Sequence, residues 1–316
     1  MTKIAFQFPG QGSQSPGMGK ALSESFAAAR EVFEEVDDTL GENLSRLMFE
    51  GPAEDLTETD KAQPALMTAS IAVMRTLEQE FGLKLGQTAS FVAGHSLGEY
   101  SALCAAGALT LSDTARLLRL RGTAMKEAAP TGTSGMTALL GLEMEQVHTI
   151  CEQASEGDSI VVTANDNAPG QIVISGHLDA LDRADALAAE AGAKRCVRLP
   201  VAAAFHSPLM APAAERMAEA LGETSFAAPV VPVIANVEAI PVQLPTQLRD
   251  RLIEQVTGAV RWRESIGWLA EHEIELLVEA GSGKVLTGLA RRIDRRVKGI
   301  ACETPADLEK FASTYL

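Results

Sequence analysis

The segment from Phe91 to Ala102, FVAGHSLGEYSA, constrains the fold of this chain more than any other feature. It predicts a short apolar strand, a sharp turn through GHSLG and a helix that continues to Leu103. A turn of this kind exposes a serine hydroxyl at a strained strand-to-helix corner, in front of a helix N-terminus. We therefore interpret Ser96 as a candidate nucleophile. An ordinary turn between a strand and a helix is the alternative interpretation.

Composition excludes several other classes of protein. The chain has 316 residues, of which 46% are hydrophobic and 22% charged, so it is able to bury a large core. Its net charge of −15 argues against nucleic acid and anionic membranes as partners. No apolar run reaches the roughly 18 residues that a membrane-spanning helix needs. The start of the chain, KIAFQF, predicts a strand and not a signal peptide.

The four cysteines are widely spaced, with no CxxC pair and no histidine at ligand spacing. This pattern argues against a zinc site and against a disulfide framework. We expect a cytoplasmic protein without a metal centre, and a monomer.

Strands and helices alternate along the chain, which predicts the α/β class with a mostly parallel sheet. Between a turn at Pro130-Thr131-Gly132 and residue 200, the expected order is strand, helix, strand, strand, helix, strand, the order of a ferredoxin-like unit. We therefore expect residues 130–200 to form a small ferredoxin-like domain. It is inserted in a large α/β-hydrolase-like catalytic domain made of residues 1–129 and 201–316, and its wall closes one side of a cleft.

Two further segments carry polar groups where an enzyme would need them. The loop PGQGSQ follows the expected strand Lys3 to Phe8, and its Gln11 is placed to offer a main-chain N–H to a developing oxyanion. An ordinary connecting loop is the alternative. His206 ends an apolar segment and is the best candidate for a base, with a hydrogen-bonded core histidine as the alternative.

Arg121 falls on the apolar face of the helix expected from Leu111 to Ala128, capped by Ser112-Asp113. A buried guanidinium is costly unless it is paired with an anion. That anion is either an internal carboxylate, which the cost of burial slightly favours, or the carboxylate of a substrate.

A basic run near the C-terminus contains Arg291, Arg292, Arg295, Arg296 and Lys298. Such a run usually forms a solvated face. In a chain as acidic as this one, docking of an acidic partner or of a nucleotide phosphate is the alternative.

Six motifs together resemble one enzyme family over nearly the whole chain. They are PGQGSQ, GHSLGEYSAL, RGTAMKEA, AFHSPLM, a glutamine (Gln255) ahead of VRW, and EAGSGKVLTGL. In this order they resemble the malonyl-CoA:acyl-carrier-protein transacylases of bacterial fatty-acid synthesis. The resemblance implies malonyl-CoA as the substrate, an acyl carrier protein as the acceptor, and no metal or redox cofactor.

The resemblance also implies roles for individual residues. Ser96 is acylated, His206 acts as base and acid, and the main-chain amides of Gln11 and Leu97 form the oxyanion hole. Arg121 binds the malonyl carboxylate. Gln255 orients His206 through either its side-chain or its main-chain oxygen.

Three more side chains are implied to contact the substrate, namely Phe205, His95 and Met125. Phe205 is expected to crowd the α-carbon and to favour malonyl over methylmalonyl groups. Three other functions compete with this interpretation. They are a free-standing polyketide-synthase acyltransferase, a serine thioesterase of the α/β-hydrolase class, and a non-catalytic subunit that binds a carrier protein through the basic run.

Overall fold

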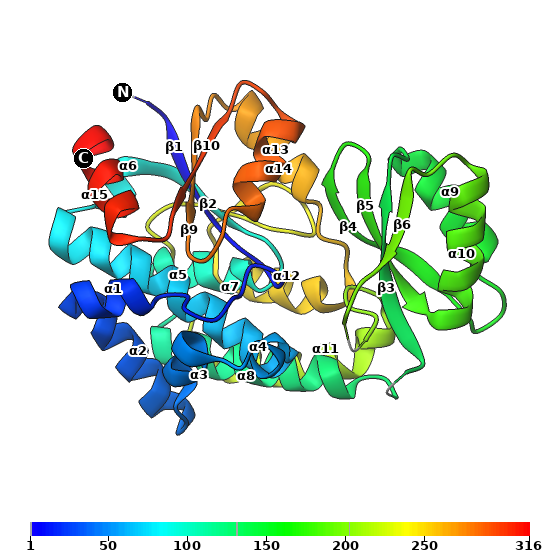
Figure 1. Cartoon of the computed structure of the whole chain (residues 1–316), viewed down its shortest axis with the longest axis horizontal. Coiled ribbons are helices and arrows are strands. Elements are labelled where there is room, and N and C mark those ends of the chain that lie inside the picture. Colours follow the sequence, from blue (N-terminus) through cyan, green and yellow to red (C-terminus); the bar gives the residue numbers. More distant parts are fainter. Residues whose placement is uncertain (1, 131, 202) are drawn as a thin grey trace.

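The computed structural model describes residues 2–130, 132–201 and 203–316. Thr131, in the predicted turn, and Ala202, near the second predicted domain boundary, lie outside the described residues, as does Met1. The described chain contains two separate sheets, one of six strands and one of four, with helices packed around each (Figure 1). No helix in these described ranges is long and apolar enough to cross a bilayer.

The six-stranded sheet is mostly parallel, as the sequence predicts. Its order is β10 (Lys298–Cys302), β9 (Leu276–Ala280), β1 (Ile4–Phe8), β2 (Ala89–Gly94), β7 (Val233–Ile234) and β8 (Pro241–Val242). All neighbouring pairs are parallel except β7 with β8. The central strand β1, IAFQF, is buried at every position, as expected for a strand covered on both faces by helices. The prediction of a mixed α/β chain is therefore confirmed.

Helices surround this sheet on both faces (Figure 1). Those before the small sheet are α1 (Lys20–Ser25), α2 (Ala27–Leu40), α3 (Leu44–Glu50), α4 (Ala53–Thr57), α5 (Thr59–Phe81), α6 (Leu85–Thr88), α7 (Gly98–Ala105) and α8 (Leu111–Glu127). Those after it are the 3-10 turn η1 (Pro208–Met210) and α11 (Ala211–Glu223), α12 (Pro245–Thr257), α13 (Trp262–Glu271), α14 (Val285–Ile293) and α15 (Pro305–Tyr315).

The predicted cap of α8 is wrong by two residues. The side chain of Thr110, and not Ser112-Asp113, accepts a hydrogen bond at the helix start, from the Asp113 N–H at 3.0 Å. Thr110 is the last residue with extended backbone before the helix, which is the position where a hydroxyl reaches the third helical amide.

The four-stranded sheet has the order β4 (Val161–Ala168), β5 (Gln171–His177), β3 (Ser134–Leu140) and β6 (Arg195–Arg198). All its pairs are antiparallel. With α9 (Met144–Ala154) and α10 (Leu178–Glu190), the chain order is strand, helix, strand, strand, helix, strand, as the sequence predicts. Both helices cover the face of this sheet that points away from the large sheet (Figure 1).

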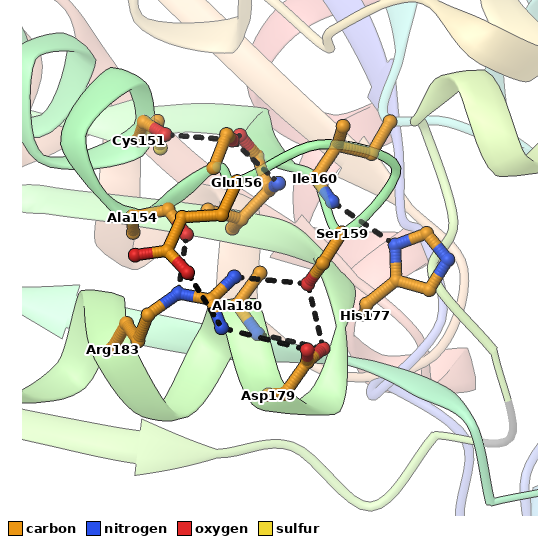
Figure 2. Close-up of polar contacts among 11 residues, drawn as sticks. Cys151, Ala154, Glu156, Ser159, Ile160, His177, Asp179, Ala180 and Arg183 are labelled. Atoms are coloured by element: carbon orange, nitrogen blue, oxygen red, sulfur yellow. Dashed lines mark hydrogen bonds and ion pairs between the residues drawn. The ribbon is translucent and has the colours of Figure 1, made fainter.

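A polar cluster fixes the loop between α9 and β4 (Figure 2). Arg183 of α10 donates to the Ala154 carbonyl at 2.7 Å and to the Ser159 hydroxyl at 2.9 Å. Ser159 in turn donates to Asp179 at 2.7 Å. The main-chain N–H of Ile160 donates to the ring of His177 at 3.1 Å. These groups satisfy one another, so the cluster holds the small sheet's loop in place.

The small sheet is hydrogen-bonded to the segment that leads into α13. Strand β4 pairs with Val260 through main-chain hydrogen bonds, from Val260 N–H to the Ala164 carbonyl at 2.8 Å and from Asp166 N–H to the Val260 carbonyl at 2.9 Å. The buried carboxylate of Asp166 also accepts from Arg263 Nε at 2.9 Å and 2.8 Å. The segment that precedes α13 is thus held against the small sheet.

The structure divides the basic C-terminal run. Arg296 pairs with Asp294, and Arg292 donates to Gln171 and to the Pro169 carbonyl in the hairpin of the small sheet. The others line a shallow groove with Lys284 beside α14; these are Arg291, Arg295 and Lys298.

Candidate active site

The turn GHSLG, residues 94–98, carries the candidate nucleophile Ser96 and is called the nucleophile turn below. It forms where β1 and β2 end together. Phe8 and Gly94 are register partners in these parallel strands, and the His95 N–H donates to the Phe8 carbonyl at 3.0 Å. Ser96 follows with a φ of +53°, in the left-handed region that a side chain seldom adopts. The strain is imposed by close packing, because a Cβ on Gly94 would lie 1.8 Å from the Gly98 carbonyl oxygen. The turn therefore presents the serine as the sequence predicts.

His206 meets this serine from a distant part of the chain. The Ser96 hydroxyl lies 2.7 Å from His206 Nε2. On the other side of the ring, Nδ1 lies 2.9 Å from the main-chain oxygen of Gln255 and 3.1 Å from that of Gly258. Carbonyl oxygens only accept, so Nδ1 carries the proton and Nε2 offers a lone pair to Ser96. Gln255 thus orients the imidazole through its main-chain oxygen.

The electrostatics of His206 suit a base. Burial, with a smaller contribution from the nearby Arg121 cation, lowers the pKa of His206 to about 3. The imidazole is therefore neutral at neutral pH and free to accept a proton. Like Ser96, His206 has a positive φ, of +56°. Strained backbone at two converging residues is typical of active sites.

Arg121 also reaches the serine, and its surroundings correct one expectation. The side chain is 1% exposed, and its three hydrogen bonds go to uncharged oxygens. They are Gln63 Oε1 at 2.7 Å, Gln255 Oε1 at 2.8 Å and Ser96 Oγ at 3.2 Å. The prediction that an internal salt bridge pairs Arg121 is wrong, since no carboxylate among the described residues lies within 4.0 Å of this guanidinium. The buried cation instead keeps a donor directed at the Ser96 hydroxyl.

The remaining predicted residues surround a pocket of about 230 Å³ at this point. Its lining includes Gln11, Leu97, Phe205, His95 and Met125, together with the three residues above. Within the part of the chain that the structure describes, the N–H groups of Gln11 and Leu97 donate to no protein acceptor. Both amides are therefore left for a ligand oxygen.

The side chains of three lining residues are themselves fixed. His95 Nε2 lies 2.7 Å from Asn167 Oδ1 of the small sheet, and burial lowers the pKa of His95. Phe205 is 7% exposed and Met125 1% exposed, so both present apolar surface from the core. Because β4 supplies Asn165 to the lining, the small sheet closes one side of the pocket.

Comparison with known proteins identifies the family. A family model described as an acyl transferase domain matches residues 5–301. The chain belongs to the acyl transferase family. Together with the full-length malonyl CoA-acyl carrier protein transacylases that this chain resembles, the match confirms the family predicted from the motifs.

Individual relatives of this acyl transferase are similar over their full length. It is 47% identical over 314 residues to a malonyl CoA-acyl carrier protein transacylase of Bacillus subtilis, covering 99% of this chain and 98% of the relative. A crystal structure of an acyl-carrier-protein-S-malonyltransferase from Bartonella henselae is 54% identical, with a TM-score of 0.97 and 99% of each chain covered. A malonyl-transacylase solved with a type II PKS acyl-carrier protein is 40% identical, with a TM-score of 0.95 and 99% of each chain covered.

Three buried polar residues of this acyl transferase escape the sequence analysis. Gln63 of α5 and Glu99 of α7 lie on helices rich in apolar residues, and Asn236 follows β7. Asn236 fixes the nucleophile turn: its Oδ1 accepts from the Ser96 N–H and its Nδ2 donates to the Gly94 carbonyl, both at 2.7 Å. For Gln63 and Glu99 the one signal in the sequence is a polar residue at a position that the helical pattern predicts to be buried.

The described ranges contain no group of three or more His, Cys, Asp and Glu side chains arranged to hold a metal ion. The site of this acyl transferase is instead a serine, an imidazole held by carbonyls, a buried guanidinium and two unused main-chain donors. Such a set is able to form and to break an ester of a substrate that ends in a carboxylate.

Proposed function

We propose that this enzyme transfers the malonyl group from malonyl-CoA to the phosphopantetheine thiol of an acyl carrier protein, through a malonyl ester of Ser96. The observation that carries the proposal is the convergence of His206 Nε2 and Arg121 Nη2 on one hydroxyl, at 2.7 Å and 3.2 Å. The base activates the oxygen, and the guanidinium marks where a free carboxylate at the far end of the acyl chain binds. In malonate that acid stands one carbon beyond the reacting carbonyl.

In the first half-reaction, His206 takes the Ser96 proton as Oγ attacks the thioester carbon. The negative oxygen of the tetrahedral intermediate accepts from the Gln11 and Leu97 amides. The intermediate then collapses, the carbon–sulfur bond breaks, and the imidazolium returns its proton to the CoA thiolate. In the second half-reaction His206 deprotonates the carrier thiol, which attacks the ester carbon; the bond from that carbon to Oγ breaks, and the imidazolium returns the proton to Ser96. Both halves need only these protein groups, and we propose that no cofactor takes part.

Arg121 accounts for the choice of acyl group. A malonyl carboxylate gives the buried guanidinium a charged partner, whereas an acetyl group leaves it with neutral acceptors only. Phe205 lies beside the same pocket and is proposed to crowd a methyl group on the α-carbon.

The finer fold assignment belongs to the same proposal. We propose that the large sheet with its helices, residues 1–129 and 201–316, is α/β-hydrolase-like, and that residues 130–200 form a ferredoxin-like domain. The order β4-β5-β3-β6 with α9 and α10 on one face supports the second assignment. We further propose a cytoplasmic monomer that serves fatty-acid synthesis.

The geometry argues against a thioesterase with a serine-histidine-acid triad. In such an enzyme a carboxylate orients the histidine. Here the oxygens on His206 Nδ1 are the main-chain carbonyls of Gln255 and Gly258. A polyketide carrier as acceptor involves the same chemistry, and the rates on fatty-acid and polyketide holo carriers distinguish the two.

Intact mass spectrometry tests the proposal. Malonyl-CoA alone is expected to add one malonyl group to the protein, and holo carrier protein is expected to remove it and become malonylated. Ser96→Ala abolishes the adduct. Ser101→Ala, which removes a buried hydroxyl one turn further along α7, keeps it and serves as the matched control. CoA release at the same rate without any carrier, or the absence of an adduct, would contradict the transfer.

A further inference from the structure

Glu99 is a buried carboxyl to which the proposed mechanism gives no role. It lies in the first turn of α7, directly behind the nucleophile turn, and is 1% exposed. Its Oε2 accepts two hydrogen bonds, from Gln255 Nε2 at 2.7 Å and from the Asn236 N–H at 3.1 Å. A carboxyl in this position is costly to bury, so its partners must account for its presence.

The first partner passes its effect to Arg121. The Gln255 amide accepts from Arg121 Nη2 through Oε1 at 2.8 Å and donates through Nε2 to Glu99. If the amide turned over, its NH₂ group would face the guanidinium and its oxygen would face the carboxyl and the Ser96 carbonyl. Glu99, together with the Ser96 carbonyl that accepts from the same Nε2 at 3.0 Å, therefore fixes which end of the amide faces Arg121.

The second partner passes its effect to Ser96. Asn236 donates its main-chain N–H to Glu99 Oε2, and its side chain holds both the Ser96 N–H and the Gly94 carbonyl. One carboxyl oxygen thus holds Gln255, which contacts Arg121, and Asn236, which contacts the Ser96 main chain.

We propose that Glu99 is a positioning residue for substrate selection: through the Gln255 amide it holds the Arg121 guanidinium where the acid end of the acyl group binds. This inference rests on the proposed function. Burial raises the pKa of Glu99 to about 7. Because a carboxyl keeps an acceptor oxygen whether or not it is protonated, the placement of that oxygen is the working element, and not the charge.

Two conservative variants separate placement from charge. Glu99→Gln removes the charge and keeps an acceptor oxygen at the same reach, whereas Glu99→Asp keeps the charge and withdraws the acceptor by one methylene. The measurement is the ratio of kcat/KM for malonyl-CoA to that for acetyl-CoA, with a holo carrier protein as acceptor. We expect Glu99→Gln to stay within about twofold of the wild-type ratio and Glu99→Asp to lower it about tenfold, the scale of one hydrogen bond to a charged group.

A second background tests the route through Gln255. Gln255→Met removes the amide but keeps the main-chain oxygen on His206, and in this background Glu99→Asp is expected to leave the ratio unchanged. The inference is overturned if Glu99→Asp keeps the wild-type ratio, if Glu99→Gln loses as much as Glu99→Asp, or if Glu99→Asp has its full effect without Gln255. A wild-type enzyme with no preference for malonyl-CoA would refute the proposed function instead. If Glu99 had only a structural role, its variants would change the unfolding midpoint but not the ratio of kcat/KM for the two donors.

Discussion

Replacing Arg121 by alanine tests the proposed selectivity most directly. In the structure the guanidinium has only neutral acceptors, on Gln63, Gln255 and Ser96, so an incoming carboxylate supplies its first charged partner. Breaking a buried charge pair costs about 3–5 kcal/mol. We take the lower value of about 3 kcal/mol, because neutral acceptors already satisfy part of the fork, and at 1.36 kcal/mol per tenfold this is about 10²-fold in rate.

The assay is kcat/KM for malonyl-CoA and for acetyl-CoA, with the same holo carrier as acceptor. Arg121→Ala also removes the bond to Ser96 Oγ, which lowers the rate with both donors, so the ratio of the two isolates the carboxylate. We expect malonyl preference to fall about 10²-fold. Arg121→Lys keeps the charge without the planar fork, so its malonyl preference should fall between those of the wild type and of Arg121→Ala. A ratio unchanged in Arg121→Ala would refute the assigned role.

Four further predictions concern His206, Phe205 and Gly94. Burial puts the pKa of His206 at about 3, below its unfolded value of about 6.5; the neutral base should persist, so kcat/KM shows no loss due to His206 as pH falls from about 8 to 5. Because of this depressed pKa, the unfolded state binds a proton at His206 at a higher pH than the folded state does. The stability difference between wild type and His206→Asn should therefore shrink as pH falls below about 6.5, by up to about 1.4 kcal/mol per pH unit in urea titrations, and a constant difference would count against it. Phe205→Leu should raise the methylmalonyl-to-malonyl ratio of kcat/KM about tenfold, and no rise would show that Phe205 does not crowd the α-carbon. Gly94→Ala places a Cβ 1.8 Å from the Gly98 oxygen and should destabilise the fold by about 3 kcal/mol. The control Gly288→Ala, in a helix with nothing within 4 Å, should be neutral or stabilising, by up to about 1 kcal/mol in urea unfolding, and equal losses in the two would exclude the packing explanation.

Much of the fold could be predicted because its signals are local. The strand and helix around Ser96, the order of elements between 134 and 198, and the apolar face of α8 all follow from periodicity and glycine placement. The cap of α8 was missed because Thr110 and Ser112 are both capping residues, and only the backbone conformation decides between them.

The partners of Arg121 show which contacts in the site could not be predicted from the sequence. The burial of Arg121 follows from the helical pattern, but the choice between an internal carboxylate and neutral amides depends on α5 and α12, 58 and 134 residues away in sequence. For the same reason the sequence left open which oxygen of Gln255 orients His206.

The sequence by itself determined the family, the α/β class, the nucleophile turn and the identity of the groups that we propose react. Tertiary structure alone decided how those groups are held: the two carbonyls on His206, the Asn236 clamp on the turn, and the Glu99 oxygen behind Gln255. The physical reason is that a periodic pattern reports whether a side chain is buried. The partner that a buried polar group finds is set by the packing of distant segments, which no local pattern encodes.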